Sequence, residues 1–161
     1  MKIDWIPRVK YSICNSQQKQ KLSFKANTAE KNFFTSVDDC LYRGRMPGNK
    51  AELAVLKNSG ISTIVDLTTE TQYDIDTVEN LGMEYFNLHF SSEPSRAILD
   101  QFFAIVDNAK ENGKKIYVHC VLGQLRTGLM VNLYKLYNNM PVEGINSTYA
   151  RMIFDRYKGK I

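Results

Sequence analysis

The sequence predicts an α/β domain in which a central, mainly parallel sheet is flanked by helices. Short runs rich in β-branched residues alternate with helical patterns of ten or more residues, as in sheets whose strands are joined by crossover helices. The 161 residues suffice for one domain with a substantial core but not comfortably for two. A composition of 43% hydrophobic and 24% charged residues is typical of a globular domain.

Residues 1–31 are polar and show no sustained period, so we interpret them as an N-terminal extension and residues 32–161 as the folded domain. No run near the start is long and apolar enough for a signal peptide. No segment approaches the roughly 20 apolar residues that a membrane helix needs. We therefore expect a cytoplasmic protein without a membrane span.

The first half of the domain predicts alternating strands and helices. The elements are, in order, a short strand within 40–48, a helix at 49–60, a strand at 61–67, a helix at 69–82 and a strand at 83–90. Leu53 and Leu56 lie on one face of the first helix. The strand at 61–67 is a β-branched run of suitable length, and Gly82 closes the more polar second helix.

The second half begins with a strong helix signal. Pro94 fits the first position of a helix that follows Ser92 or Glu93, and Gly113 ends that helix. Apolar residues repeat along it at helical spacing, namely Leu99, Phe102, Phe103 and Val106. The remaining elements are a strand at 114–120 and helices at 126–139 and 141–157.

The stretch "VHCVLGQLRTG" joins the last strand to a helix that begins near Arg126. The N-terminus of a helix presents unpaired backbone N–H groups and the positive end of the helix dipole, an arrangement that suits phosphate. Gly123 allows the backbone to fold closely around an anion. Arg126 can hold phosphate oxygens with two hydrogen bonds.

Cys120 lies at the base of this loop, where the N–H groups and the charge of Arg126 would lower its pKa and favour the thiolate. A thiolate that faces a bound phosphate is positioned to attack phosphorus. The Thr127 hydroxyl can donate a hydrogen bond to the sulfur. We expect His119 to support the loop rather than act as a base, and Gly128 to serve close packing. Cys14 and Cys40 are interpreted as core or surface thiols, and a redox partnership with Cys120 is a minor second interpretation.

The motif "HCVLGQLRTG" resembles the H-C-x5-R-[ST]-G signature of cysteine-dependent protein tyrosine phosphatases. The segment "LYRGRMPGNKAELAVLKNSGISTIVDLTTE" is similar to the atypical dual-specificity branch. The resemblance implies a dual-specificity phosphatase fold and phosphate monoester hydrolysis without metal or cofactor, through a cysteinyl-phosphate on Cys120. It also implies that the loop binds the phosphoryl group. The loop residues are Val121, Leu122, Gly123, Gln124, Leu125 and Arg126.

The chain departs from this family at the general acid, because Ser92 stands where many members have an aspartate. Glu93 follows immediately and could protonate the leaving oxygen. An equally open interpretation makes Glu93 a helix-start residue favoured by the dipole. Weaker candidates for the acid are His89, Asp66 and Asp100.

The sequence leaves the substrate open. The net charge of +4 is compatible with an anionic substrate but too weak to indicate nucleic acid. We expect a phosphorylated partner, a phosphoprotein or a small phosphate monoester. The uncharged loop disfavours polyphosphoinositides, although an inositol phosphate stays open as a substrate. Arg43, Arg45 and Arg96 could supply extra anion contacts, but surface solvation is expected for at least two of them.

Two competing functions are also compatible with a loop cysteine. One is a catalytically weak phosphate- or phosphopeptide-binding module, which the missing aspartate would favour. The second is a rhodanese-like sulfurtransferase, although five residues between Cys120 and Arg126 fit phosphate better than persulfide chemistry. The sequence does not indicate an oligomeric state.

Overall fold

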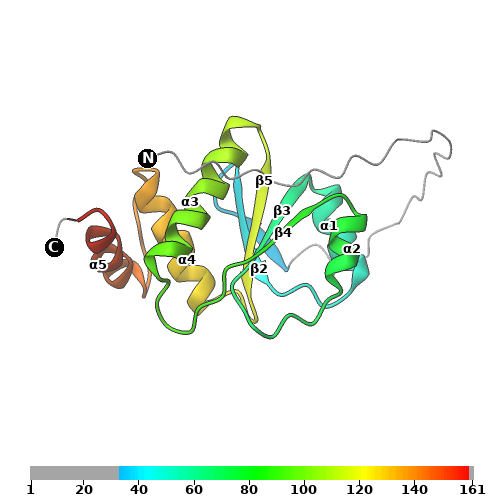
Figure 1. Ribbon diagram of the computed structural model, residues 1–161, viewed down its shortest axis with the longest axis horizontal. Helices are drawn as coiled ribbons and strands as arrows, with labels where there is room; N and C mark the ends of the chain where they lie inside the picture. Colours follow the sequence, from blue (N-terminus) through cyan, green and yellow to red (C-terminus); the bar gives the residue numbers. More distant parts are fainter. Residues whose placement is uncertain (1–32, 160–161) are drawn as a thin grey trace.

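The computed structural model describes residues 33–159, which form a five-stranded sheet with helices on both faces (Figure 1). The strands are β1 (Phe34–Ser36), β2 (Leu41–Arg45), β3 (Ile61–Asp66), β4 (Glu84–Asn87) and β5 (Lys115–Cys120). Their spatial order is β1-β2-β5-β3-β4, and every neighbouring pair is parallel except β1 with β2. The predicted fold class is therefore confirmed. The predicted extension at 1–31 lies outside the described residues.

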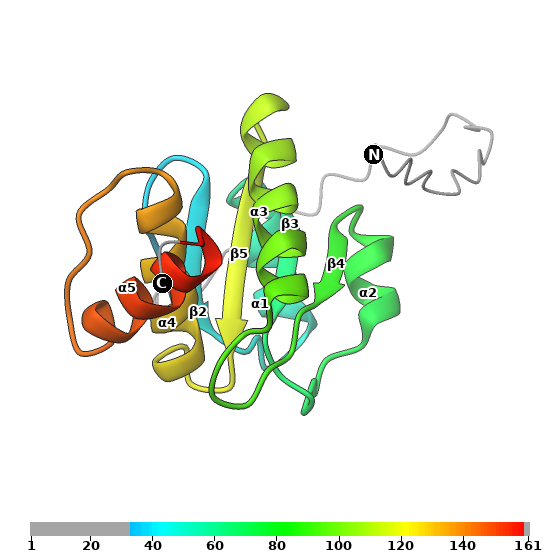
Figure 2. The same ribbon diagram turned by 60° about the vertical axis from the view of Figure 1, so that its left-hand side comes forward.

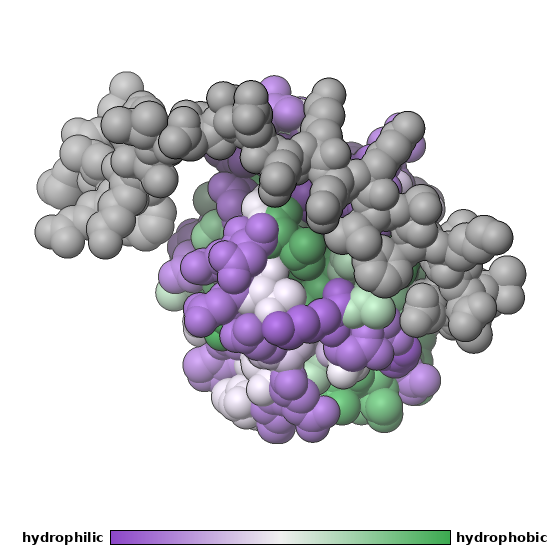
Figure 3. Space-filling model, turned by 90° about the vertical axis from the view of Figure 1, so that its right-hand side faces the viewer, coloured by the Kyte–Doolittle hydropathy of each residue, from purple (hydrophilic) through white to green (hydrophobic). Residues whose placement is uncertain are grey.

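The helices divide between the two faces of the sheet (Figures 1 and 2). One face carries α1 (Lys50–Asn58) and α2 (Ile75–Asn80), and the other carries α3 (Arg96–Glu111), α4 (Leu125–Tyr137) and α5 (Ser147–Tyr157). Each face has its own buried cluster. Figure 3 looks onto the face of α1 and α2, where polar side chains predominate and apolar surface is visible in the upper middle and at the lower edge. That is the edge at which β5 ends in Figure 2.

Helix α3 shows how the sequence builds the larger cluster. Its apolar residues recur every three or four positions, so they form one stripe that faces the sheet. The buried members of the stripe are Leu99, Phe102, Phe103, Val106 and Ala109. Burying each of the larger side chains stabilises the fold by about 1.5–3 kcal/mol.

The predicted start of α3 was wrong by two residues. The helix begins at Arg96, and Ser95 is its N-cap, because the Ser95 hydroxyl accepts a hydrogen bond from the backbone N–H of Ile98. Pro94 therefore precedes the cap rather than occupying the first helical turn. A serine that follows a proline competes well for the cap because its side chain satisfies an otherwise unpaired N–H group.

The second predicted helix, at 69–82, is only six residues long in the structure. The buried carboxylate of Asp66 accepts hydrogen bonds from the Thr68 N–H and the Thr71 hydroxyl, which hold the preceding residues in a loop. Asp74 then caps α2 by accepting from the N–H of Asp76. Short polar side chains that bond to nearby backbone favour turns over helix, and this explains the lost turns.

Two further elements are shorter than the sequence predicts. The strand predicted at 83–90 covers Glu84–Asn87, and the last helix, predicted at 141–157, begins at Ser147. Gly144 has a φ of +83°, which a right-handed helix excludes. Helix α4 begins one residue earlier than predicted, at Leu125. Within residues 33–159, no helix is long and apolar enough to cross a membrane.

Candidate active site

The motif loop lies at the carboxyl end of the central strand. Strand β5 pairs with β2 on one side and β3 on the other, ends at Cys120 and leads through residues 121–124 into α4 (Figure 2). Gln124 is the N-cap residue of α4, and its side chain makes no capping hydrogen bond. The first N–H groups of α4 therefore have no side-chain cap. Such groups at a helix N-terminus are suited to bind an anion.

The outer side of the loop is pressed against the end of β2. Gly123 has a φ of +70°, and a Cβ at this position would overlap the carbonyl group of Gly44. The N–H of Met46 donates to the carbonyl oxygen of Val121 at 3.1 Å, and the guanidinium of Arg43 donates to that of Gly123 at 2.7 Å. Because these two carbonyl groups are bonded to β2 and the residue after it, the loop can direct its N–H groups to the inner side.

Cys120 is the last residue of β5 and lies at the start of this loop. The side chain is 5% exposed, and this burial raises its pKa. The hydroxyl of Thr127 and the backbone N–H groups of Thr127, Gly123 and Gln124 lower it, and together they outweigh burial. The net effect is a pKa below the usual value for cysteine. The predicted thiolate environment is present, but its leading contributions come from Thr127 and the backbone rather than from Arg126.

Thr127 is fully buried, and its Oγ1 forms no hydrogen bond of ordinary geometry with any described residue. A buried hydroxyl without a partner costs free energy, so a group of this kind in a native fold usually has a function. The Thr127 hydroxyl also lowers the pKa of Cys120.

Arg126 lies in the first turn of α4 and is held from the neighbouring strand. Its Nη1 donates to the carbonyl oxygen of Leu67 at 3.0 Å, just beyond the end of β3. Its Nη2 lies 3.9 Å from the Glu70 carboxylate, whose side chain is 58% exposed. The guanidinium is thus anchored on one side, and the arrangement restricts the directions in which it can meet an anion.

His119 is buried beneath the loop and not positioned to exchange protons with solvent. Its Nε2 is 2.7 Å from the hydroxyl of Tyr73, and its Nδ1 is 3.9 Å from the Asp66 carboxylate. Burial lowers the pKa of His119, while Asp66 opposes that shift. The backbone carbonyl of His119 accepts from the N–H of Leu67 at 2.9 Å. These contacts suit the supporting role predicted for His119.

Glu93 is turned toward α5. Its Oε1 accepts from Arg156 Nη1 at 2.8 Å, and its Oε2 accepts from the Tyr149 hydroxyl at 2.8 Å. No hydrogen bond joins Glu93 to the motif loop in the described part of the chain. The carboxylate therefore fastens the loop before α3 to α5 in this conformation.

The weaker candidates for the acid are engaged elsewhere. Asp66 is fully buried and accepts hydrogen bonds from Thr68, Thr71 and Tyr85. The ring of the exposed His89 contacts Asn87 at 2.8 Å, and Asp100 accepts from the Tyr157 hydroxyl at 2.9 Å.

The remaining predicted residues occupy the rim or the support of the loop. Val121, Leu122 and Leu125 are 38%, 72% and 71% exposed. Gln124 is exposed as well. The space beside Gly128 would accept a methyl group, because its nearest neighbour would lie 3.5 Å away. Close packing therefore does not require glycine at this position.

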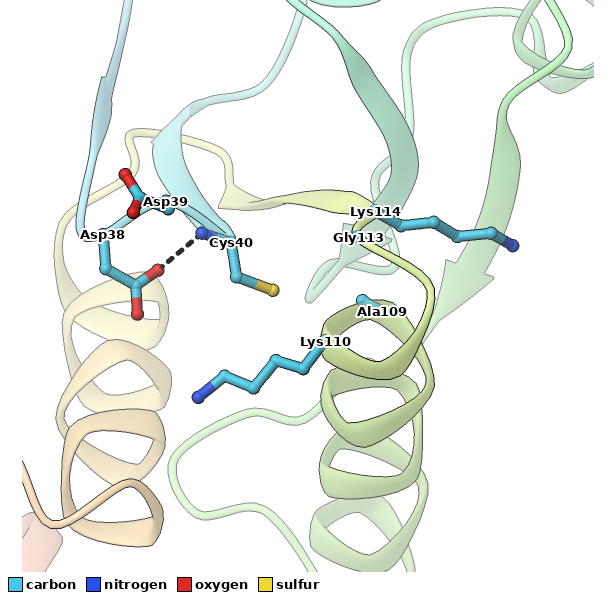
Figure 4. A pocket seen from close by; sticks show the side chains of 7 residues that line it. All are labelled: Asp38, Asp39, Cys40, Ala109, Lys110, Gly113 and Lys114. Carbon is cyan, nitrogen blue, oxygen red and sulfur yellow. Dashed lines mark hydrogen bonds between the residues drawn. The ribbon is translucent and has the colours of Figure 1, made fainter.

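Cys40 lies far from Cys120. It immediately precedes β2, and the register of β2 and β5 sets it beside Lys115, five residues before Cys120. At about 3.3 Å per residue, the two Cα atoms are roughly 16 Å apart, beyond the reach of a disulfide. Cys40 faces a separate cavity of about 410 Å³ with Lys110 nearby (Figure 4), and burial raises its thiol pKa. Cys14 lies outside the described residues.

Sequence reasoning misses two supports of the loop, Arg43 and Tyr73. The sequence suggests solvent or extra anion contacts for Arg43, and it places Tyr73 in a predicted helix. The position of Arg43 between Tyr42 and Gly44, shortly before a predicted turn, is only a weak indication that it supports the loop. Nothing local to Tyr73 indicates its contact with His119, which lies 46 residues away.

Comparison with known proteins adds family information. A family model described as "Polymorphic toxin system, DSP-PTPase phosphatase" matches residues 41–139. The chain is 31% identical over 143 residues to the RNA/RNP complex-1-interacting phosphatase homolog of Caenorhabditis elegans, covering 79% of this chain and 60% of that protein. It is 30% identical over 105 residues to protein phosphatase Slingshot of Drosophila melanogaster, covering 63% of this chain and 10% of that protein. The chain thus spans between a tenth and about three fifths of these relatives.

Solved structures agree on the fold. The crystal structure of Tk-PTP in its active form superposes with a TM-score of 0.62 at 23% identity, covering 80% of this chain and 86% of that one.

Within residues 33–159, no group of three or more His, Cys, Asp or Glu side chains is arranged to hold a metal ion.

Proposed function

We propose, from the premise that this chain belongs to the DSP-PTPase phosphatase family of polymorphic toxin systems, that it hydrolyses phosphate monoesters through Cys120. The observation that carries the proposal is the position of Cys120 at the end of β5, before the uncapped N-terminus of α4, in a loop whose Val121 and Gly123 carbonyl groups are bonded on the outer side. The hydroxyl of Thr127 and backbone N–H groups of the loop lower the pKa of the Cys120 thiol. Groups that stabilise a thiolate also suit the oxygens of a phosphate bound above it. Phosphotyrosine and other phosphorylated residues of proteins are the proposed substrates.

The first step is attack of the Cys120 thiolate on phosphorus. The S–P bond forms as the P–O bond to the leaving group breaks, and the leaving oxygen takes a proton. The backbone N–H groups of the loop and the Arg126 guanidinium bind the three non-bridging oxygens. They stabilise the charge that these oxygens carry in the transition state. The contact of Arg126 with Leu67 restricts its motion, so less conformational entropy is lost on binding.

The second step returns the enzyme to its starting state. Water attacks phosphorus and gives up one proton to the group that donated a proton in the first step, which is now its conjugate base. The S–P bond breaks, and Cys120 leaves as a thiolate while inorganic phosphate is released. The Thr127 hydroxyl supports this step, since a hydrogen bond to sulfur makes the thiolate a better leaving group. Its unpaired state beside the thiol agrees with that role.

Glu93 is our proposed proton donor to the leaving group, on the basis of its place in the sequence. In this role its carboxylate must leave Arg156 and Tyr149 and turn toward Cys120. The ion pair at 2.8 Å is half-exposed, and pairs of this kind contribute only about 0–1 kcal/mol. Release from α5 is therefore energetically accessible.

The same ion pair also supports a second candidate function. If Glu93 stays on α5, the loop can bind phosphate but has no proton donor, as expected of a phosphopeptide-binding module. Cys120→Ser distinguishes the two functions, because serine keeps the shape of the loop without a comparable nucleophile. Under the enzymatic proposal this variant loses turnover of an aryl phosphate and still binds phosphate. Undiminished turnover in Cys120→Ser would refute the mechanism, and a wild type that binds but never turns over would favour the module.

A further inference from the structure

Arg126, the proposed phosphate clamp, has an acidic neighbour. Its Nη1 is bonded to the carbonyl oxygen of Leu67, whereas its Nη2 makes no hydrogen bond with any described residue. The Glu70 carboxylate lies 3.9 Å from that Nη2, and it is the only carboxylate that pairs with Arg126 among residues 33–159. The Arg126 side chain is 23% exposed, so part of it is reachable from solvent. Glu70 therefore places a negative charge beside the proposed position of the phosphate.

The loop that carries Glu70 is held on both sides of this residue. The buried carboxylate of Asp66 accepts hydrogen bonds from Thr68 and Thr71. The side chain of Asn87 donates to the carbonyl oxygen of Thr68 at 2.7 Å. Within the described part of the chain, the half-exposed Glu70 side chain itself makes no hydrogen bond. The backbone at Glu70 is thus held in place, while its carboxylate can respond to a ligand.

The positive charges of the motif loop and of β2 are already engaged. Arg43 is bonded to a carbonyl group of the loop, and Arg45 is bonded to a carboxylate of α1. Residues 121–125 are uncharged, and Arg126 is needed for the phosphoryl group itself. A second anionic group on the substrate would therefore meet the Glu70 carboxylate, and neither the loop nor β2 would offer it a free cation.

The ion pair does not keep phosphate away from the clamp. A pair of this length and exposure is weak, so an anion can reach Arg126 without first displacing Glu70. A bound phosphate neutralises the guanidinium, and the Glu70 charge then acts on the group that carries the phosphate. A second negative charge there is repelled, whereas a neutral group is not and a positive group is attracted.

We propose that Glu70 is a specificity-determining residue that disfavours substrates with a second anionic group beside the phosphoryl group. The inference rests on the proposed function and narrows its substrates to phosphate monoesters in neutral or basic surroundings. It applies alike to a second phosphate and to an acidic side chain, because both carry negative charge.

The test uses the full-length protein and two phenyl phosphates that differ in charge. One carries a meta carboxylate and the other the neutral carboxamide, which has nearly the same shape, and the rigid ring keeps either group close to the phosphate. We measure kcat/KM for both with wild type and with Glu70→Gln, which removes the charge and keeps the shape. The preference for the carboxamide should be about three- to tenfold larger in wild type than in Glu70→Gln.

Two other outcomes would overturn the proposal. An equal preference in the two proteins would show that the Glu70 charge does not act on the substrate. A preference that grew in Glu70→Gln would indicate that Glu70 protonates the leaving group, because the carboxamide phenol is the better leaving group and depends less on a proton.

Two variants and added salt separate this effect from a general change of charge. Glu84→Gln is the matched control, because Glu84 is half-exposed and paired with Lys114 but lies at the start of β4. The strands β4, β3 and β5 are parallel, so this start lies at the edge opposite the motif loop. Glu84→Gln should keep the wild-type preference, and Glu70→Asp should keep most of it. Salt at 1 M should reduce it, because charges are then screened within about 3 Å. An equal reduction in Glu84→Gln and Glu70→Gln would reject the role of Glu70.

Failure of the proposed function has a different signature. If wild type hydrolyses neither phenyl phosphate nor p-nitrophenyl phosphate, the enzymatic proposal fails, and both phenyl phosphates are titrated against the protein by calorimetry instead. Tighter binding of the carboxamide by wild type, with a smaller difference in Glu70→Gln, would still support the role of Glu70. The same difference in both proteins would reject it.

Discussion

The guanidinium of Arg43 donates a 2.7 Å hydrogen bond to the carbonyl oxygen of Gly123, joining β2 to the motif loop across 80 residues of sequence. This bond holds a loop carbonyl away from the anion site. Under the proposed function, a carbonyl group that rotated inward would place a negative dipole where the phosphate oxygens are expected to bind. Arg43 is therefore a positioning residue, because it acts on the loop rather than on the substrate.

Arg43→Ala should lower kcat/KM for a small aryl phosphate by about 10- to 100-fold, since a hydrogen bond from a charged group contributes about 1.5–3 kcal/mol. It should also weaken inhibition by vanadate, which a purely structural role would not change in a folded protein. Arg45→Ala is the matched control, because Arg45 lies on the same strand and is paired with Glu52. Equal losses in the two variants would contradict the positioning role.

The sequence predicted the part of the site that is local in the chain. Cys120, Gly123, Arg126 and Thr127 lie within eight residues, and their spacing alone constrains a strand, a loop and a helix N-terminus. The contact of Arg43 with the loop depends on strand order, which local patterns do not determine. The predicted start of α3 failed for another reason, since Ser95 competed with the residues before Pro94 for the cap.

The pH dependence of the thiol provides a direct test of Thr127. The pKa of Cys120 lies below its usual value, so the thiolate persists to lower pH and is lost as the pH falls through that pKa. Thr127→Val keeps the volume and removes the hydroxyl, so the pKa should rise. The midpoint of alkylation by iodoacetamide should then move to higher pH.

This alkylation is measured in proteins that carry Cys14→Ser and Cys40→Ser, so that only Cys120 reacts. Thr35→Val is a suitable control, because Thr35 is an exposed threonine on β1. A midpoint that stays in place or moves to lower pH in Thr127→Val would show that the hydroxyl does not stabilise the thiolate.

Tyr73 should stabilise the folded protein through the contact of its hydroxyl with His119. Tyr73→Phe removes the hydroxyl that contacts Nε2 of a fully buried imidazole, which leaves a polar atom without a partner. The expected cost is about 1–3 kcal/mol in the free energy of unfolding, measured by urea denaturation. Tyr85→Phe is the control, because the Asp66 oxygen that it contacts also accepts from Thr71. A larger loss in Tyr85→Phe would contradict this account.

The ion pair between Glu93 and Arg156 allows the general acid to be tested with two variants of opposite effect. An alkyl oxygen needs a proton to leave, whereas an activated aryl oxygen does not. If Glu93 donates that proton, Glu93→Gln should slow alkyl phosphates far more than p-nitrophenyl phosphate. Arg156→Ala frees the carboxylate from α5, so it should preserve or raise the rate with alkyl phosphates. Arg151→Ala controls for the loss of positive charge, because Arg151 is an exposed arginine on the same helix.

If the ion pair were only a structural clamp, replacing either of its partners would have the same small effect on every substrate. Equal leaving-group dependence in wild type, Glu93→Gln and Arg156→Ala would therefore remove Glu93 from the mechanism.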